Sequence, residues 1–281
     1  MEEENCSEAI LAALLSLNST RFSNLLRTLA SDSLFQLQRL RALLLSPLRF
    51  LRTLRYIDSL SLPQKTHLIA RLLLRSLQRI THHLSDDHTS DALLGGTLGG
   101  FQDYDAGLLL YTLCQLSDSE RLRLAESSDW WATVADHVAR EALRFSGLGS
   151  VGWAVLSPHV DAAMKCRRFI EAAGCWREKG EGRAAASVVV SIGAAVVSGG
   201  STGWRECVIC KEELREACEL PCSHVFHRVC IARWLTKNNT CPYCRLELPT
   251  DDVFCEIQRL WKLIVARSRL DLRGDCISKR I

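Results

Sequence analysis

The chain has 281 residues, of which 47% are apolar, and its formal net charge at pH 7 is only +3. This length allows two domains of ordinary size with a sizeable buried core, and so small a net charge does not by itself indicate a partner. The thirteen cysteines do not indicate a secreted disulfide scaffold, because the opening MEEENCSEAI is acidic and lacks a signal-peptide pattern. Its glutamates are also untypical of a transit peptide, so we expect reduced cysteines in a cytosolic or nuclear compartment.

Residues 1–179 have helical periodicity and almost none of the alternation expected of strands. Helices are predicted for SEAILAALLSL, Thr66–Ile80, Ser117–Phe145 and the segment that begins at Ser157. In this last segment Ser157 is the expected N-cap, Pro158 the first helical residue and Gly174 the stop. A glycine-bearing loop is predicted around LLGGTLGGFQDYDAG. We therefore expect a mostly α protein that begins with a helical bundle.

The first part of this bundle is strongly basic. From Arg21 to Arg79 the chain has eleven Lys and Arg residues, opposed only by Asp32 and Asp58. In LRFLRTLRYI a spacing of three predicts a short amphipathic surface helix, with Leu48, Leu51, Leu54 and Ile57 against its arginines. Two interpretations stay open: the basic face contacts an anionic membrane or acidic partner, or it is the solvated face of an ordinary bundle helix. The candidates for membrane contact are Arg49, Arg52, Arg55, Arg71, Arg75 and Arg79.

Residues 180–203, GEGRAAASVVVSIGAAVVSGGSTG, are small and nearly uncharged. Their apolar part, Ala184–Val197, is shorter than the roughly 20 residues that span a bilayer, and glycine and serine interrupt it. We predict a flexible linker here, which could carry a docked strand, and no clear transmembrane segment.

The stretch that starts at Trp204 contains cysteines and histidines in the pattern C-x2-C-x11-C-x-H-x2-H-x2-C-x10-C-x2-C. Eight sulfur and imidazole ligands are enough for two tetrahedral zinc sites. Each x2 pair supplies half a site and must find a second pair. The candidate ligands are Cys207, Cys210, Cys222, His224, His227, Cys230, Cys241 and Cys244. Cys218 is expected to be an ordinary small side chain, because Cys222 pairs more closely with His224. The scattered thiols are Cys6, Cys114, Cys166, Cys175, Cys255 and Cys276.

This ligand order, together with Phe226 and the sequence CIARWL, resembles the RING-H2 zinc fingers of ubiquitin ligases over residues 204–249. A PHD finger would have a single histidine in fifth place, and a LIM domain has a different order. The resemblance implies a cross-brace in which each zinc ion takes the first and third, or second and fourth, ligand pairs. One set is Cys207, Cys210, His227 and Cys230, and the other is Cys222, His224, Cys241 and Cys244. Such interlocking stabilises a domain too small to be held by its core alone.

With four protein ligands each, the zinc sites are expected to be structural, which leaves recognition as the role of the finger. The resemblance implies docking of a ubiquitin-loaded conjugating enzyme on Ile209, Trp234 and Pro242. Arg245 resembles the linchpin arginine that contacts that enzyme and ubiquitin together. The implied activity is that of a RING-type ubiquitin-protein ligase, which orients the thioester toward a substrate lysine without a covalent intermediate on this chain. The alternative is a zinc-dependent interaction adaptor without ligase activity. Nucleic-acid binding is not expected, because the basic stretch lacks interleaved aromatic residues.

Residues 250–281 are predicted to add a C-terminal helix and tail. Asp251 is the expected cap, and Phe254, Ile257, Trp261 and Ile264 form an apolar side. The layout of a helical part with SLPQKTHLIARLLL, a small-residue linker and a final RING-H2 finger resembles plant amyloplast ubiquitin ligases of shoot gravitropism. That resemblance implies a cytosolic protein peripheral to the plastid surface. The expected domains are therefore 1–179 for substrate, partner or membrane contact, the linker 180–203, the finger 204–249 and the tail.

Overall fold

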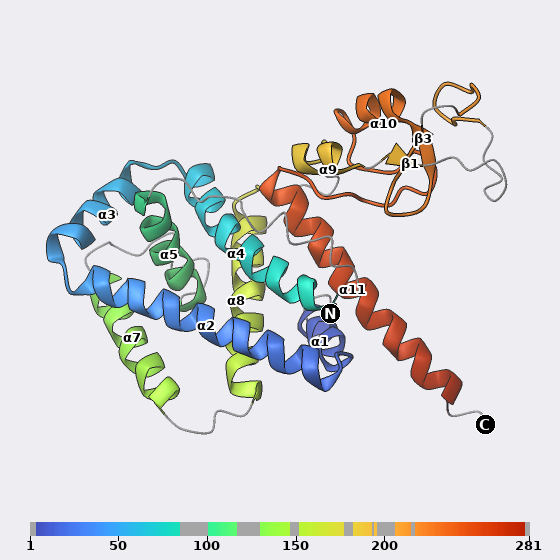
Figure 1. Cartoon of the computed structure of the whole chain (residues 1–281). Helices are drawn as coiled ribbons and strands as arrows, with labels where there is room; N and C mark the ends of the chain where they lie inside the picture. Colours follow the sequence, from blue (N-terminus) through green and yellow to red (C-terminus); the bar gives the residue numbers. More distant parts are fainter. Residues whose placement is uncertain are drawn as a thin grey trace. The chain divides into compact units, whose positions relative to one another are not determined.

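The computed structural model describes residues 4–84, 101–116, 130–146, 152–176, 182–192, 194–195, 206–214 and 217–278. It divides into two compact units, Met1–Trp176 with Leu260–Ile281, and Arg177–Arg259. Because helix α11 (Val253–Ser278) runs past the boundary, it contributes to both units (Figure 1). Helices make up most of the described chain, which confirms the expected mostly α class.

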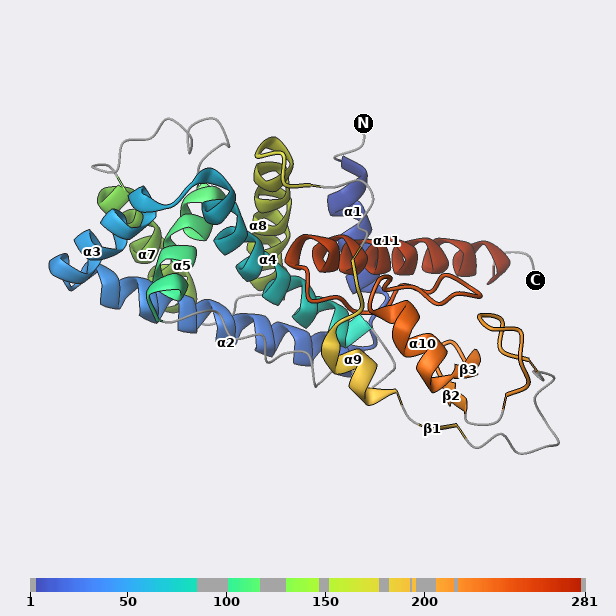
Figure 2. The same ribbon diagram turned by 90° about the horizontal axis from the view of Figure 1, so that it is seen from above.

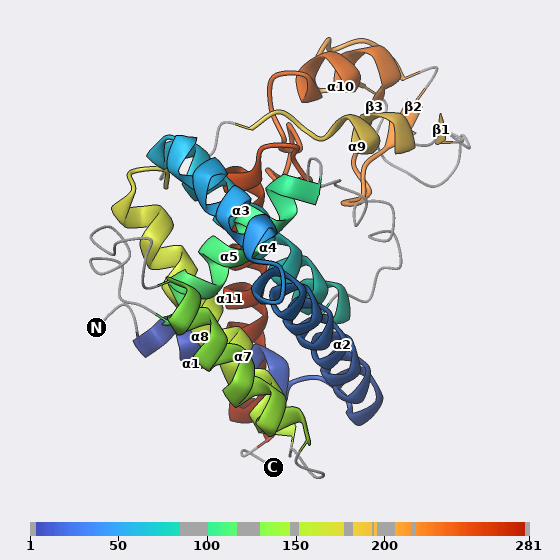
Figure 3. The same cartoon turned by 90° about the vertical axis from the view of Figure 1, so that its left-hand side faces the viewer.

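The first unit is a helical bundle, as predicted. In chain order its helices are α1 (Glu4–Leu15), α2 (Ser19–Leu44), α3 (Pro47–Ser59), α4 (Leu62–Leu84), α5 (Phe101–Leu116), α7 (Trp130–Ser146) and α8 (Gly152–Ala172), with the later part of α11. Helix α5 contacts α2, α3, α4, α7 and α8, and Figure 3 shows it among these helices. It is therefore the central helix of the bundle. Of the predicted tract Ser117–Phe145, residues 117–129 lie outside the described part.

The start of α5 corrects one prediction. The glycine-bearing loop was expected to run to Gly107, whereas the helix already begins at Phe101; residues 93–100 lie outside the described part. Leu108, Leu109 and Leu110 are all buried, and as consecutive residues of the helix they point in three different directions. A helix that is apolar all round has no amphipathic period. The sequence pattern was therefore too weak to separate this buried helix from a loop.

Helix α8 corrects a second prediction. It begins at Gly152, so Pro158 lies inside the helix and Ser157 is not its N-cap. Leu156 and Val160, on either side of the proline, are both buried. Packing of both flanks holds the helix continuous although Pro158 cannot donate a backbone hydrogen bond. The predicted stop is present: Gly174 has φ +69°, the left-handed conformation that commonly ends helices.

The buried face of α3 also differs from the face that the spacing of three predicted. Its buried residues are Phe50, Thr53, Leu54 and Ile57, a face with spacings of three and four. Leu48 and Leu51 were expected on the same side as Leu54 but are exposed. The aromatic Phe50 replaces them in the core, because a strict spacing of three drifts around an α-helix.

The basic face is partly neutralised by an acid from outside the basic stretch. Asp105 on α5 is only 3% exposed. Its two carboxylate oxygens accept hydrogen bonds from Arg39 and Arg49, each 2.5 Å from the nearest guanidinium nitrogen. Arg79 pairs with Asp32. These ion pairs fasten α2, α3 and α4 to their neighbours, so these arginines are part of the fold and not of a free cationic surface.

The second unit is the cysteine-rich finger. Strands β1 (Ala194–Ala195), β2 (Ala217–Glu219) and β3 (Val225–His227) form an antiparallel sheet in the order β1-β2-β3. Helix α10 (Arg228–Leu235) follows β3 directly, as Figure 2 shows. Phe226, Ile231 and Leu235 are almost fully buried and form the centre of a small core.

Part of the predicted linker packs against this finger. Ala184 N donates to the carbonyl of Leu235 (3.0 Å), and Ala185 N donates to that of Pro249 (2.8 Å). Both alanines are buried. A short helix, α9 (Ala186–Ser191), follows them, and β1 then pairs with β2. Small side chains are needed where the backbone approaches the finger so closely, which accounts for the alanine-rich composition.

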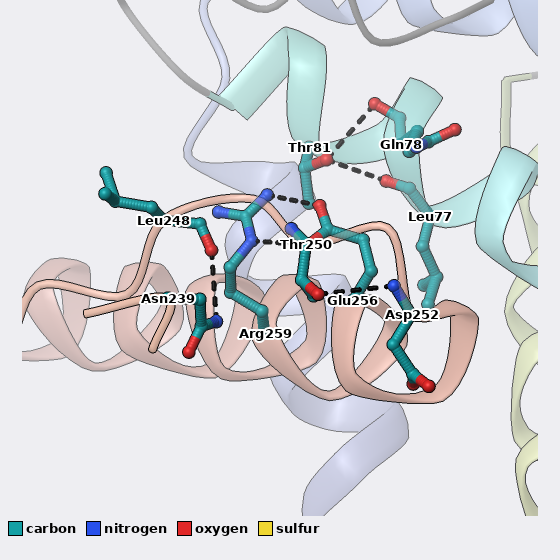
Figure 4. Close-up of polar contacts among 9 residues, drawn as sticks. All are labelled: Leu77, Gln78, Thr81, Asn239, Leu248, Thr250, Asp252, Glu256 and Arg259. Carbon is teal, nitrogen blue, oxygen red and sulfur yellow. Dashed lines mark hydrogen bonds and ion pairs between the residues drawn. The ribbon is translucent and has the colours of Figure 1, made fainter. Parts of the chain in front are cut away.

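The first turn of α11 is held by a small polar network (Figure 4). Thr250 N donates to Glu256 Oε2 (3.0 Å), and Arg259 Nε donates to the same oxygen (2.8 Å). Asp252 is the cap, because its Oδ1 accepts a hydrogen bond from Cys255 N (2.8 Å). The prediction of Asp251 was wrong by one residue; its carboxylate instead accepts from Ala186 N in the docked segment. Ile257, Trp261 and Ile264 are buried as expected.

Candidate zinc centre

Two turns of the same geometry hold the first and last ligand pairs. Lys211 N donates to Cys207 O (2.7 Å), and Arg245 N donates to Cys241 O (2.9 Å). Lys211 and Arg245 both have positive φ, 65° and 59°. An isolated antiparallel bridge flanks each turn, Glu206 with Glu213 and Thr240 with Glu247. The two C-x2-C sequences therefore fold into the tight knuckles that their spacing predicts.

The first cluster contains Cys207, Cys210, His227 and Cys230, with one ligand atom of each within 4.8 Å of all the others. His227 Nδ1 lies 3.3 Å from Cys210 Sγ. Its other ring nitrogen, Nε2, lies 2.9 Å from the carbonyl oxygen of Glu213, to which it donates when Nδ1 is the ligand. A hydrogen bond of this kind fixes the tautomer and orientation of a metal-binding imidazole.

The second cluster contains Cys222, His224, Cys241 and Cys244, again with ligand atoms within 4.8 Å of one another. His224 Nδ1 lies 3.2 Å from Cys222 Sγ. Ser223 between them has φ 60°, a left-handed conformation that bends the chain between the two ligands. The ring of Tyr243 lies against that of His224, with centroids 4.4 Å apart. The structure thus brings together both four-residue sets that the cross-brace implied.

The electrostatics of the clusters suit a cation. Burial, together with the neighbouring thiols of Cys241 and Cys244, raises the pKa of Cys222 to about 12. Burial and the nearby Cys210 and Cys207 raise the pKa of Cys230 to about 11. Thiols crowded in this way resist carrying several negative charges unless a positive charge lies between them. Sulfur and imidazole donors in sets of four select Zn²⁺, so the finger binds two zinc ions.

The pKa of Cys207 is shifted in the opposite direction. Burial would raise it, but backbone amides around the thiolate, including those of Cys210 and His227, lower the pKa to about 7. Hydrogen bonds to the charged form favour that form. This first knuckle therefore holds a thiolate with little cost near neutral pH, which favours metal binding.

The other cysteines are outside these clusters. Cys218 is buried in β2, and its thiol donates to the carbonyl of Phe226 at 3.6 Å, so it is the ordinary small side chain that was expected. Cys114 and Cys166 are buried in the helical unit. Cys175 and Cys255 are partly buried and form no disulfide bond. The side chains of Cys6 and Cys276 lie outside the described part.

The predicted docking residues lie on the outside of the finger core. Ile209 and Trp234 are both partly buried against the same apolar cluster. Trp234 Nε1 donates to the carbonyl of Thr240 (2.7 Å), which fixes the indole ring to the loop that carries Pro242. Arg245 is exposed. Its left-handed backbone is part of the second knuckle, so the metal-binding turn sets where this side chain starts. The partner-binding roles of these residues stay predictions.

Several contributions were not predicted. The carbonyl of Glu213 orients His227, Tyr243 packs on His224, and the docked residues 182–192 and 194–195 extend the finger. Every residue type has a main-chain carbonyl, so the role of Glu213 could not be predicted from the sequence. The run of small residues before Trp204 was a visible signal, but it also suits a flexible linker.

Comparison with known proteins adds two findings. The Ring finger domain family matches residues 205–245. Over 96% of its length the chain is 40% identical to the E3 ubiquitin-protein ligase SGR9, amyloplastic, of Arabidopsis thaliana, of which it covers 99%. The chain is also 47% identical to an E3 ubiquitin-protein ligase RNF181 homolog of Drosophila melanogaster, over 23% of the chain and 46% of that protein. It is 54% identical to E3 ubiquitin-protein ligase RNF181 of Danio rerio, over 16% of the chain and 30% of that protein. No solved structure matches.

Proposed function

The chain belongs to the family of RING-type E3 ubiquitin-protein ligases, and from this premise we propose how its own residues promote ubiquitin transfer. A conjugating enzyme loaded with ubiquitin docks on Ile209, Trp234 and Pro242, while Arg245 steadies the bound ubiquitin. The full-length similarity to a named ligase is the observation that supports this proposal most strongly. It also favours the ligase over an adaptor, because the similarity includes the helical part as well as the finger.

Docking needs an apolar surface that is already in place before the partner arrives. Trp234 meets this need, since its hydrogen bond to Thr240 restricts the ring. Ile209 is held between Cys207 and Cys210 in the first knuckle, and Pro242 between Cys241 and Cys244 in the second. Both ends of the docking surface thus depend on a zinc site. A rigid apolar surface loses little entropy on binding, which is typical of an interface hot spot.

Arg245 acts after docking. Its exposed guanidinium carries five donors in a fixed fork, which can contact the conjugating enzyme and ubiquitin at once. Such a contact restrains the thioester-linked ubiquitin in a folded-back arrangement in which a lysine amine can attack. The rate then rises through orientation, with no bond formed between ubiquitin and this chain. The zinc ions hold the surface in shape and take no part in the transfer.

This division of roles is tested by discharge of a ubiquitin-loaded conjugating enzyme onto free lysine. Arg245→Ala should lower the single-turnover rate about ten- to a hundred-fold, because a charge-assisted contact worth about 1.5–3 kcal/mol is lost. Its affinity for the conjugating enzyme should change little. Ile209→Ala should weaken that affinity instead. The matched control is Lys211→Ala, which removes the corresponding cationic side chain of the other knuckle. If Arg245→Ala discharges ubiquitin as fast as wild type, Arg245 is not the linchpin.

We propose further that residues 1–179 bring the ligase to its substrates on the outer surface of plastids. A full-length relative is named amyloplastic, which supports this location. Among the described residues, no helix is long and apolar enough to cross a membrane. Association would then be peripheral, through the surface of the helical unit. Cell fractionation with intact plastids tests it: the chain should sediment with them and be released by salt.

A further inference from the structure

Three large apolar side chains are exposed where α2 meets α3. Leu45 is 74% exposed, Leu48 80% and Leu51 51%. No other seven-residue stretch within the described ranges exposes more than two large apolar side chains. Apolar exposure that is concentrated in this way is typical of a contact surface, whereas single exposed leucines need no explanation.

The geometry of α3 explains why these leucines cannot turn into the core. Leu48, Leu51, Arg52 and Arg55 follow at spacings of three and four, so they form one outer face, and all are exposed. The opposite face carries Phe50, Leu54 and Ile57, which are buried. Rotation of the helix to bury the leucines would expose Phe50 and Ile57. The two leucines are therefore fixed outward by the packing of the bundle.

The exposed leucines have cationic neighbours. Arg52 and Arg55 continue the outer face of α3, and Arg41 is exposed in the last turn of α2. Asp58, near the end of α3, is the one exposed acid on that helix. Arg49 is different, because Asp105 holds it by two hydrogen bonds. Of the six arginines that the sequence suggested for membrane contact, only Arg52 and Arg55 are exposed, and the other four are partly buried.

We propose that this corner surface, formed by Arg41, Leu45, Leu48, Leu51, Arg52 and Arg55, docks on an anionic lipid bilayer. The inference rests on the peripheral location proposed above and names the residues that produce it. The leucines enter the boundary between headgroups and acyl chains, and the guanidinium groups bind lipid phosphates. An amphipathic surface with leucine on one part and arginine on its border is the composition of interfacial helices. Figures 1 and 2 both draw α3 at an edge of the helical unit, where a flat bilayer can reach it.

The charges favour lipid over a second copy of the chain. In a symmetric dimer the same patch meets itself, so the arginines of the two copies would be brought together and would repel. An anionic bilayer attracts all of them. Each arginine near such a surface strengthens binding about fivefold at moderate ionic strength. The leucines add the apolar contribution that charge alone does not supply.

The test is sedimentation of the full, zinc-loaded chain with vesicles of phosphatidylcholine alone or mixed with phosphatidylglycerol. We expect binding to the anionic vesicles, with a steep loss as salt is added. The double variant Leu48→Glu/Leu51→Glu should bind at least tenfold more weakly, and so should Arg52→Glu/Arg55→Glu. The matched controls are Leu143→Glu, at another strongly exposed leucine, and Arg140→Glu, at an exposed arginine of α7. Both controls should bind like wild type. Free inorganic phosphate should not compete, which separates a lipid surface from a single anion site.

The possible failures are distinct. If wild type binds anionic vesicles and the corner variants bind equally well, the corner surface is wrong while the peripheral location stands. If wild type binds no vesicle, the lipid proposal fails as a whole, although the ligase activity is untouched. If light scattering shows a dimer that the leucine variants dissociate, a second copy occupies the surface and the inference is overturned. Far-ultraviolet ellipticity and the thermal midpoint of the helical unit, measured for every variant, should equal those of wild type and show that the bundle remains folded, and ubiquitin discharge in solution should be unchanged because the finger is not altered.

Discussion

The finger and the helical unit of this chain are each stabilised by a different kind of interaction. In the finger, eight ligands of fixed chemistry converge on two points, and the apolar core is small. In the helical unit, long helices bury leucine and isoleucine around α5, and a few ion pairs join them. Metal-ligand geometry allows one arrangement of a given ligand pattern, whereas apolar faces can meet in several ways. The two units should therefore respond differently to the same perturbation.

Removal of metal should separate them most clearly. Chelation of zinc should unfold the finger and abolish ubiquitin discharge, because metal binding supplies about 10 kcal/mol or more to small zinc domains. The helical unit contains no zinc ligand of either cluster, so most of the far-ultraviolet ellipticity should remain. Elemental analysis should find two zinc ions for each chain before chelation. A folded protein with a single zinc would contradict the assignment of one cluster.

The next largest effect is expected in the segment before the finger. Ala185 is fully buried, and its amide donates to Pro249. Ala185→Glu would bury an unpaired carboxylate and should destabilise the finger by about 3 kcal/mol. Faster loss of zinc to a chelator measures this, with Val190→Glu as the control at an exposed position of the same segment. Equal rates for both variants would mean that the segment is a free linker after all.

The helical unit has its own sensitive position in Asp105. Asp105→Asn leaves Arg39 and Arg49 without their anionic partner and should lower the stability of the bundle by about 2 kcal/mol. This figure is moderate because both arginines are partly exposed to water, which screens them. Thermal unfolding of the helices measures it. Asp136→Asn, at an exposed ion pair of α7, should change the midpoint hardly at all. Zinc content should be unchanged in both variants.

Acid should weaken both units, but for separable reasons. Burial lowers the pKa of His159 to about 4, below its usual value of about 6.5 in the unfolded chain. The unfolded state therefore binds a proton first, so this contribution is complete above pH 6.5 and is lost as the pH falls toward 4. The bundle should lose about 2 kcal/mol between pH 7 and pH 5 through this residue. His159→Gln should flatten that dependence, while the acid release of zinc from the finger stays as in wild type. An unchanged slope would show that His159 is not the group responsible.

The two units also differ in how much of their structure could be predicted from the sequence. The reason is again that metal ligands form a recognisable pattern, whereas apolar faces can meet in several ways. The spacing of the eight ligands predicted two zinc sites, because thiolate and imidazole have few other uses in such a pattern, and the resemblance to RING-H2 fingers implied which ligands form each cluster. The sequence did not show that the ring of His227 forms a hydrogen bond with the main-chain carbonyl of Glu213, because every residue has such a carbonyl. In the bundle, α4 and the stop of α8 were predictable from apolar period and Gly174. The early starts of α5 and α8 were not predictable. Helix α5 is buried on all sides and lacks an apolar period, and α8 continues through Pro158 because buried residues on both sides of the proline hold it in place.

The sequence by itself determined the chemistry of this protein: a two-zinc finger of ubiquitin-ligase type attached to a basic, largely helical part. Only the tertiary structure decided which charges and leucines of that part are available. Asp105 lies far along the chain from Arg39 and Arg49, yet folding places it between them and pairs the charge of Arg49 with a buried carboxylate. Leu48 and Leu54 look alike in the sequence, but the packing of Phe50 and Ile57 turns one outward and the other into the core. Exposure depends on what other segments cover, and no local pattern contains that information.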